Sequence, residues 1–263
     1  MFSLEEYIKE IQNNLDNNQQ RDLKWLVKDL PNNPNNQQIS TFKTHVKQLQ
    51  QSKPLAYILG NIPFYNCKIT LNDSTLIPRP ETELLVDIII QRWKDKLNKS
   101  THILDLCSGS GCIAIALQKT LKCIVDAVDL NLDCCTIIKK NAQLNNTNIN
   151  IFQSNMFQNI NGKYDLIISN PPYIPTAEIQ KLDKNVKDYE PHTALDGGKD
   201  GLDFYRTIAE QSIKHLNKNG KLALEIGYNQ GKSITQLLQT NFIDIEIKND
   251  YSNLPRFIFA TLK

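Results

Sequence analysis

The stretch ILDLCSGSGCIAIAL, residues 103–117, decides the fold. It opens with apolar, β-prone residues around Asp105, continues with the small residues Cys107-Ser-Gly-Ser-Gly111, and ends with apolar residues at helical spacing. Two glycines separated by one small residue let a strand turn tightly into a helix and let a ligand approach the backbone. Ala114 and Ala116 are small enough for that helix to pack close to the strand. The sequence therefore predicts a strand, a ligand-binding turn and a helix.

The chain continues to alternate between strand-like and helix-like segments after this stretch. Apolar, β-rich runs predict strands at 102–106, 123–129, 149–153, 164–169, 221–226, 243–247 and 256–262. Helical spacing predicts helices at 111–120, 132–145, 201–217 and 229–239. This alternation is typical of an α/β fold with a mostly parallel, seven-stranded sheet covered by helices on both faces. Ligands of such sheets bind at the carboxyl ends of the strands.

An acidic residue, Asp129, ends the second expected strand. A carboxylate there can accept hydrogen bonds from both ribose hydroxyls of a nucleoside. The full G-x-G-x-x-G fingerprint is absent, and Cys112-Ile113 gives little sign of the pyrophosphate cradle that a dinucleotide needs. The Asp-x-x-x-Gly-x-Gly turn paired with this aspartate instead resembles the class I S-adenosylmethionine-dependent methyltransferases, which have a Rossmann-like fold. Asp126 points to the other face of its strand, and we expect it to be structural.

The sharpest signal follows the expected strand at 164–169, where Asn170-Pro-Pro-Tyr173 stands. A conjugated nitrogen is a poor nucleophile because its lone pair is delocalised. The Asn170 side-chain oxygen and the Pro171 carbonyl can accept both N–H hydrogens of such a group and direct its lone pair at an electrophile. The two prolines fix the backbone, and Tyr173 offers a flat face for stacking. This chemistry suits base amines and glutamine side chains equally.

Composition and charge exclude several classes of protein. Of the 263 residues, 40% are hydrophobic and 22% are charged, and the net charge of +2 gives no strongly basic surface for nonspecific binding to nucleic acid or membranes. The start, MFSLEEYIKE, is acidic where a secretory signal is basic and apolar, and no run approaches the roughly 18 apolar residues of a spanning helix. We therefore expect a cytoplasmic protein.

The 6 cysteines and 4 histidines lack the spacing of a metal site. Neither a C-x-x-C pair nor an H-E-x-x-H motif occurs. In a long chain without an export signal, cysteines are usually reduced and packed as small apolar residues. We predict no metal ion.

Residues 1–53 differ in character from the rest of the chain. They are rich in Asn and Gln, with apolar residues at helical spacing, which predicts a small helical domain. The segment PNNPNNQQ at 31–38 is expected to be a loop, and Ser40 is the expected N-cap of a helix through Leu49.

Residues 54–80 are expected to form a β-hairpin linker. The predicted strands are 64–71 and 75–77, separated by a turn at Asn72-Asp73. A helix beginning near Glu81 follows the Pro78-Arg79-Pro80 segment.

Several blocks together resemble one family, the release factor glutamine methyltransferases, also called HemK-type protein methyltransferases. The resemblance runs from about residue 54 to the C-terminus, and the helical N-terminus matches in size and character only. The matching blocks are residues 54–58, 60, 76–83, 105–111, 170–173, 190–191, 194–202, 205–206, 224–227, 230 and 256.

The resemblance implies methyl transfer from S-adenosyl-L-methionine to the side-chain amide nitrogen of the glutamine in the Gly-Gly-Gln motif of class 1 peptide chain release factors, in support of translation termination. It implies a methyltransferase domain at 81–263 and a substrate-recognition role for the helical domain at 1–53. The expected partners are class 1 release factors, with no membrane and no direct nucleic-acid contact, and the expected form is a monomer.

The resemblance also assigns site residues. Those expected to hold the cofactor are Cys107, Ser108, Gly109, Ser110, Gly111, Asp129, Met156 and Asn170. Those expected to hold the substrate are Asn170, Pro171, Pro172 and Tyr173, with Asn170, Pro171 and Tyr173 catalytic. Two positions depart from the family. Asn155 replaces an acidic residue beside the adenine, and Cys107 replaces a glycine.

Four alternatives stay open. Arg79 and Glu81 either contact substrate or form an ion pair that fixes the linker to the catalytic domain. Glu190 and the Gly197-Gly198 turn either line the entrance to the site or shape a long loop. A rival activity is methylation of the amino group of adenine or guanine in nucleic acid. An enzyme with that activity needs a basic groove. The third reading of the function is a non-catalytic binding protein. The presence of the complete segment from Asn170 to Tyr173, with its two amide acceptors, argues against it.

Overall fold

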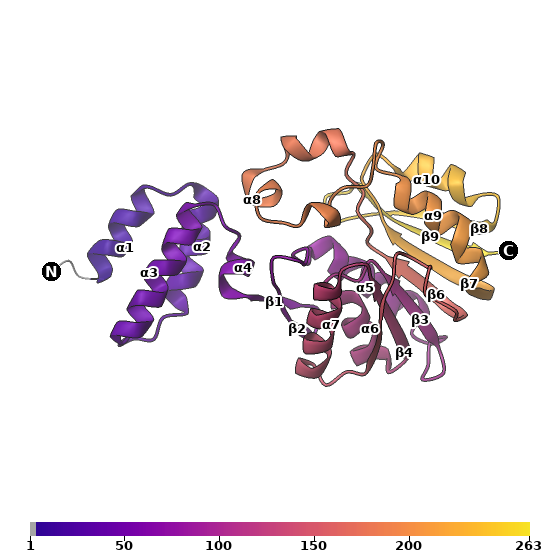
Figure 1. The fold of residues 1–263 in the computed structure, drawn as a ribbon, viewed down its shortest axis with the longest axis horizontal. Helices are drawn as coiled ribbons and strands as arrows, with labels where there is room; N and C mark the ends of the chain where they lie inside the picture. Colours follow the sequence, from indigo (N-terminus) through magenta and orange to yellow (C-terminus); the bar gives the residue numbers. More distant parts are fainter. Residues whose placement is uncertain (1–3) are drawn as a thin grey trace.

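Three short helices open the chain. The computed structural model describes residues 4–263, so residues 1–3 of the expected helical domain lie outside the described part. The helices are α1 (Leu4–Asn13), α2 (Asn17–Lys28) and α3 (Asn36–Gln50). Their apolar sides form a core of their own, built around Leu23, Phe42 and Val46. Figure 1 shows this helical bundle beside the larger sheet-containing body, joined to it through α4 (Leu55–Leu59).

The predicted start of the third helix is wrong. The Asn35 side chain accepts a hydrogen bond from the Gln38 backbone N–H at 2.9 Å, and the Gln38 side chain accepts one from the Asn35 N–H at 2.9 Å. This reciprocal pair satisfies two amides that have no helical partner. The helix therefore begins at Asn36, inside the segment expected to be a loop, and Ser40 lies within it.

The hairpin of the linker also lies earlier than predicted. Strands β1 (Asn61–Phe64) and β2 (Cys67–Thr70) pair antiparallel, and the turn falls at Tyr65, whose φ is +53°. Residues 75–77 are not a strand, because the Thr75 hydroxyl bonds back to the Asn72 carbonyl at 3.0 Å and closes a local turn. Local side-chain hydrogen bonds of this kind compete with strand pairing.

Two asparagine side chains of α7 (Leu132–Leu144) and its C-cap fix the hairpin to the main body. The Asn141 amide bonds both the N–H and the carbonyl of Thr70, at 2.8 and 2.9 Å. The Asn145 amide does the same at Lys68, at 3.0 and 2.8 Å. Each amide copies one rung of a β-ladder, so the free edge of β2 is satisfied without a further strand.

A seven-stranded, mostly parallel sheet forms the main body and confirms the predicted fold class. The strand order is β5-β4-β3-β6-β7-β9-β8, and β9 runs antiparallel to both neighbours. The strands are β3 (His102–Leu106), β4 (Ile124–Asp129), β5 (Ile149–Gln153), β6 (Tyr164–Ser169), β7 (Leu216–Glu225), β8 (Phe242–Asn249) and β9 (Pro255–Leu262). Strand order reverses between β3 and β6, which is where ligands bind on open α/β sheets.

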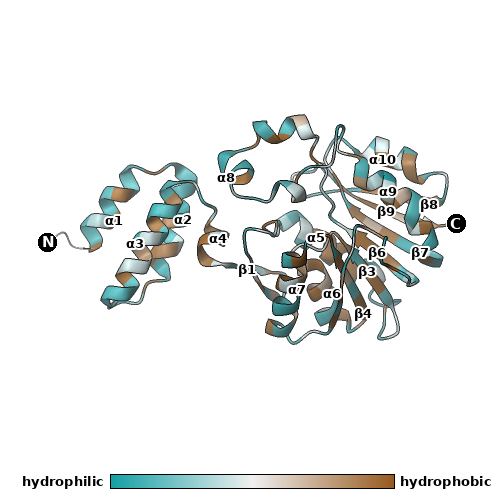
Figure 2. Cartoon of the chain, viewed as in Figure 1, coloured by the Kyte–Doolittle hydropathy of each residue, from teal (hydrophilic) through white to brown (hydrophobic). Residues whose placement is uncertain are grey.

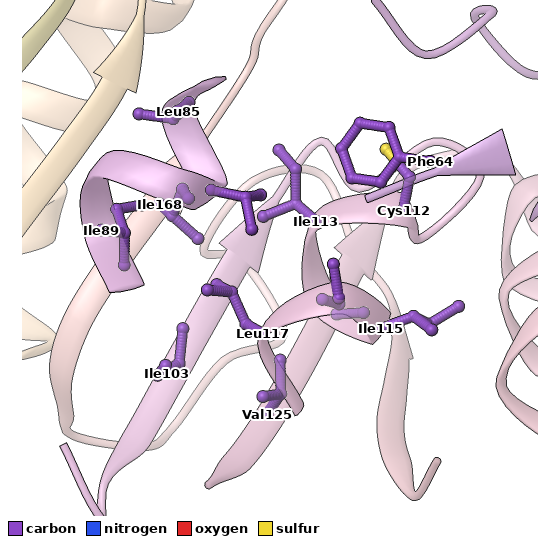
Figure 3. Packing of buried hydrophobic residues seen from close by; sticks show 14 of the residues in the cluster. Phe64, Leu85, Ile89, Ile103, Cys112, Ile113, Ile115, Leu117, Val125 and Ile168 are labelled. Carbon is purple, nitrogen blue, oxygen red and sulfur yellow. The ribbon is translucent and has the colours of Figure 1, made fainter. Parts of the chain in front are cut away.

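Helices cover both faces of this sheet. In Figure 2 the strands inside are largely brown, which marks hydrophobic residues, and the outer helix surfaces carry teal, hydrophilic residues. One face carries α5 (Pro80–Trp93), α6 (Cys112–Leu121), α7 and the hairpin, which share one apolar cluster. Figure 3 shows Phe64 of the hairpin and Leu85 of α5 packed around Ile113 of α6 in that cluster. The other face carries α9 (Asp203–Gln211) and α10 (Gly231–Leu238). Burial of both faces explains why the strands read as nearly continuous apolar runs.

All seven predicted strands are confirmed, and one predicted helix is too long. The expected helix at 201–217 ends at Gln211, and a 3-10 turn at Ser212–Lys214 leads directly into β7. Strand β7 begins at Leu216, earlier than expected, because Leu216 pairs with Tyr164 across a register shift in the β6–β7 ladder. None of the helices between residues 4 and 263 has the length and apolar character needed to cross a bilayer.

Residues 77–79 are held to the sheet-containing body by an ion pair whose acidic partner is buried. The Arg79 guanidinium bonds the Glu190 carboxylate, whose side chain is 1% exposed, and Glu190 also accepts the Ile77 backbone N–H at 3.3 Å. Of the two readings of Arg79, the structure shows the ion pair, with Glu190 rather than Glu81 as the partner. Glu190 therefore shapes the loop rather than facing an entrance.

Replacing Glu190 by Gln is expected to lower the free energy of unfolding by about 2 kcal/mol, because it leaves a partly buried guanidinium without a counter-charge. The matched control is Glu178→Gln in the exposed Glu178–Lys181 pair, where we expect a change below about 0.5 kcal/mol. Urea unfolding of both variants checks the difference. Equal effects of the two substitutions would contradict the structural role of Glu190.

Candidate active site

A cavity of about 370 Å³ lies at the carboxyl ends of β3, β4 and β6. Its wall contains most of the residues expected to bind ligand, namely Cys107, Ser108, Gly109, Ser110, Asp129, Asn170 and Pro172. Four further expected residues do not line this cavity, namely Gly111, Met156, Pro171 and Tyr173. The wall also contains residues that were not expected, among them Ser74, Pro78, Thr82 and Phe204.

The loop after β3 is tied to both flanking strands. The Ser108 hydroxyl donates to the Asp105 carbonyl at 2.7 Å and accepts the Val128 N–H at 2.9 Å. Cys107, Gly109 and Gly111 all have positive φ, at 58°, 53° and 77°. A Cβ added to Gly109 would meet no atom within 4 Å, so this position opens onto the cavity. The loop therefore presents bare backbone to a ligand.

Asp129 is the last residue of β4 and lies next to this loop. One carboxylate oxygen accepts the Gly109 N–H at 2.8 Å and the other accepts the Asn131 N–H at 2.9 Å. Burial raises the pKa of Asp129, and the bonds from backbone N–H groups oppose that shift. Each oxygen keeps a lone pair, so the carboxylate can still receive ribose hydroxyls. Asp126, by contrast, accepts hydrogen bonds from Tyr164 and Asn150, as its expected structural role requires.

Met156 lines a wider groove of about 760 Å³ that adjoins the cavity, together with Asn155 and Leu130. Leu130, Thr193 and Phe204 line both hollows, so the two are continuous at these residues. The Met156 sulfur lies 3.6 Å from the Cys107 sulfur, and Met156 has a positive φ of 50°. A planar ring entering from the cavity would meet the Met156 side chain and the exposed Asn155.

The corner after β6 carries two unused acceptors. The Asn170 side-chain nitrogen donates to the Thr82 hydroxyl at 3.2 Å, which directs the amide oxygen away from Thr82. Within residues 4–263, neither this oxygen nor the Pro171 carbonyl accepts a hydrogen bond. The Asn170 amide lies in the cavity wall, so its oxygen is available to N–H groups of a ligand there, and the neighbouring Pro171 carbonyl has no partner among the described residues.

Neighbouring segments hold this corner in place. The Gln230 side chain donates to the Tyr173 carbonyl at 2.9 Å and to the Gly201 carbonyl at 3.1 Å. A Cβ on Gly197 would lie 2.8 Å from the Pro172 carbonyl oxygen, so only glycine permits this approach. The Gly197-Gly198 turn thus shapes the loop behind the corner. Burial raises the pKa of Tyr173 to about 12, so its phenol is uncharged at neutral pH.

Three buried polar residues were not assigned by sequence reasoning. Thr82 bonds Asn170 and also donates to Glu225 at 2.8 Å, and Glu225 is 1% exposed. Asp105 is fully buried, accepts the Ala114 N–H at 3.2 Å and has one oxygen without a partner among the described residues. All three lie inside the blocks that carry the family resemblance, which was the only available signal.

Comparisons with known proteins support the fold described above. A family model described as methyltransferase small domain matches residues 80–186. A methyltransferase from Pyrococcus furiosus shares the fold, with a TM-score of 0.56 and 17% identity over 84% of this chain and 98% of that one. The fold and the site define a class I S-adenosylmethionine-dependent methyltransferase.

Sequence relatives narrow the class further. The release factor glutamine methyltransferase of Thermodesulfovibrio yellowstonii is 40% identical over 82% of this chain and 79% of its own length. That of Flavobacterium psychrophilum is 41% identical over 82% of this chain and 78% of its own length. The chain belongs to the release factor glutamine methyltransferase family.

Two glycines of the loop give separable predictions. Gly111→Ala is expected to cost about 3 kcal/mol of stability, because positive φ is unfavourable for alanine and the new Cβ meets Ile138 at 3.0 Å. Gly109→Ala has only the φ penalty, about 1 kcal/mol, but its methyl group enters the cavity and should weaken S-adenosylmethionine binding. Urea unfolding and calorimetric titration measure the two effects. Equal stability losses would contradict the packing around Gly111.

Stability should depend on pH through Asp105. Burial raises the pKa of this carboxyl to about 8 in the folded protein, whereas the unfolded chain ionises near its ordinary value of roughly 4. The folded state therefore keeps Asp105 protonated at pH values at which the unfolded chain has already lost this proton. As a result, the free energy of unfolding falls as pH rises from about 4 to 8. We expect Asp105→Asn to reduce this slope in urea unfolding at several pH values. An unchanged slope would show that Asp105 ionises normally.

Proposed function

We propose that this chain methylates the side-chain amide nitrogen of the glutamine in the Gly-Gly-Gln motif of class 1 peptide chain release factors, in the cytoplasm. The observation that carries the proposal is the pair of unused acceptors, the Asn170 side-chain oxygen and the Pro171 carbonyl, beside the loop after β3. Two acceptors match the two N–H bonds of a primary amide. Release factor glutamine methyltransferases at 40% identity support the choice of substrate.

The cavity suits S-adenosylmethionine as the methyl donor. Asp129 offers a carboxylate for ribose hydroxyls, the bare backbone at Gly109 leaves room for the methionine part, and Met156 with Leu130 offers apolar surface for adenine. Asn155 adds an uncharged polar group beside this surface. When bound, this cofactor supplies an electrophilic methyl carbon on a sulfonium sulfur.

The residues of the corner orient the substrate amide. The Asn170 oxygen and the Pro171 carbonyl receive the two N–H hydrogens, so the nitrogen lone pair points toward the cavity. The uncharged Tyr173 ring offers a face for the flat amide group. Because methylation makes the remaining N–H hydrogens acidic, one proton leaves to the Asn170 oxygen or to water without a strong base.

The helical domain gives the enzyme a second contact surface. Its core is separate from that of the sheet, and α4 and the hairpin set its distance from the cavity. We assign it to recognition of the release factor at a distance from the glutamine loop.

Asn170→Ala is expected to lower turnover roughly 100-fold, by about 3 kcal/mol in the transition state, because one of the two amide acceptors is lost. Binding of S-adenosylmethionine should change little. Transfer of labelled methyl to a purified release factor measures turnover, and calorimetric titration measures cofactor binding. Asn249→Ala, on the remote strand β8, serves as the matched control.

The same assay separates the rival activities. A release factor with its loop glutamine replaced should take no label, and neither should DNA or RNA. Label on nucleic acid would identify a base amino methyltransferase, and cofactor binding without any transfer would identify a binding protein. Unchanged turnover in Asn170→Ala would remove the proposed role of the corner.

A further inference from the structure

Thr82 sits between the substrate corner and a buried carboxyl group. It belongs to the first turn of α5 and is 3% exposed. Its hydroxyl donates to the Glu225 carboxylate at 2.8 Å and accepts a hydrogen bond from the Asn170 side-chain nitrogen at 3.2 Å. Thr82 therefore connects helix α5, the end of β7 and the loop after β6.

The direction of these hydrogen bonds decides which atom Asn170 shows to the cavity. An ionised carboxylate only accepts, so the single hydrogen of the Thr82 hydroxyl is used toward Glu225. The Thr82 oxygen can then only accept, and Asn170 must turn its NH₂ group toward it. This leaves the Asn170 carbonyl oxygen on the other side. With the amide reversed, the corner would present hydrogen-bond donors to the N–H groups of a substrate and repel them.

We propose that Thr82, held by Glu225, is a positioning residue that fixes the orientation of the Asn170 amide for methyl transfer. The proposal rests on the proposed function, because it gives Thr82 no role except through Asn170. It predicts that loss of the Thr82 hydroxyl reduces turnover without changing the cofactor site. It also assigns a task to a threonine and a glutamate that would act through the Asn170 amide.

The surroundings of Glu225 make this chain of bonds sensitive to pH. Burial raises the pKa of Glu225 to about 7, while the Thr82 hydroxyl and the Arg256 and Arg79 guanidinium groups oppose the shift and Glu81 adds to it. A protonated Glu225 can donate to Thr82, which frees the Thr82 hydrogen for the Asn170 oxygen and permits the reversed amide. Turnover should therefore rise as pH increases through about 7.

The test is a double-mutant cycle on the full-length chain with Thr82→Val and Asn170→Ala. Thr82→Val keeps the side-chain shape and removes the hydroxyl, and we expect turnover to fall on the order of 10- to 100-fold with an unchanged KM for S-adenosylmethionine. In the Asn170→Ala background the same substitution should have less than about a twofold effect, because effects of residues that act through one another are not additive. Thr82→Ser, which restores the hydroxyl, should recover most of the lost turnover.

Thr261→Val is the matched control, since it removes another buried hydroxyl far along β9. A loss of turnover from Thr82→Val that is equally large in both backgrounds would overturn the proposal, as would no loss at all. Glu225→Gln gives an independent measurement. This variant should abolish the rise of turnover around pH 7, and an unchanged pH profile would also overturn the proposal. Absence of label on a purified release factor with the unmodified chain would instead contradict the proposed function, so the two failures are distinguishable.

Discussion

The site depends on the parallel pairing of β3 with β6. Leu106 lies opposite Ser169, and the Ser169 hydroxyl donates to the Leu106 carbonyl at 2.7 Å. The loops that begin at Cys107 and Asn170 therefore start side by side. Because strand order reverses at this point, both loops open on the same side of the sheet and neither is covered by a crossover helix. Main-chain geometry thus brings the loop after β3 and the Asn170 loop after β6 together.

A second set of contacts sets the position of everything that precedes the sheet. Arg79 is bound to Glu190, and three residues later Thr82 is bound to Asn170 and Glu225. One short segment therefore fixes the linker to the loop that carries Glu190 and the start of α5 to Asn170. A shift of this segment would move the linker and the corner together, which couples the hairpin to the chemistry.

The helical domain is attached more loosely. Its own core excludes the sheet, and its contacts with the catalytic body include the Tyr189 hydroxyl, which donates to the Gln51 carbonyl at 2.8 Å. The hairpin, in contrast, is bound by the paired amides of Asn141 and Asn145. Four side-chain-to-backbone hydrogen bonds thus hold the hairpin, which lies between the helical domain and the sheet-containing body (Figure 1).

The sequence by itself determined the sheet, its seven strands and the two loops that carry the site. Buried parallel strands need long apolar runs, and the turns between strand and helix need glycine or proline, so both leave a local signature. The same local rules misplaced the hairpin, where Asn72 closes an unexpected turn, and the start of α3, where Asn35 forms a cap.

Only the tertiary structure decided which polar side chains meet. Arg79 and Glu190 are 111 positions apart, and Thr82 and Glu225 are 143 apart. No periodicity reports such contacts, because a hydrogen bond between distant segments depends on how the whole sheet brings them together.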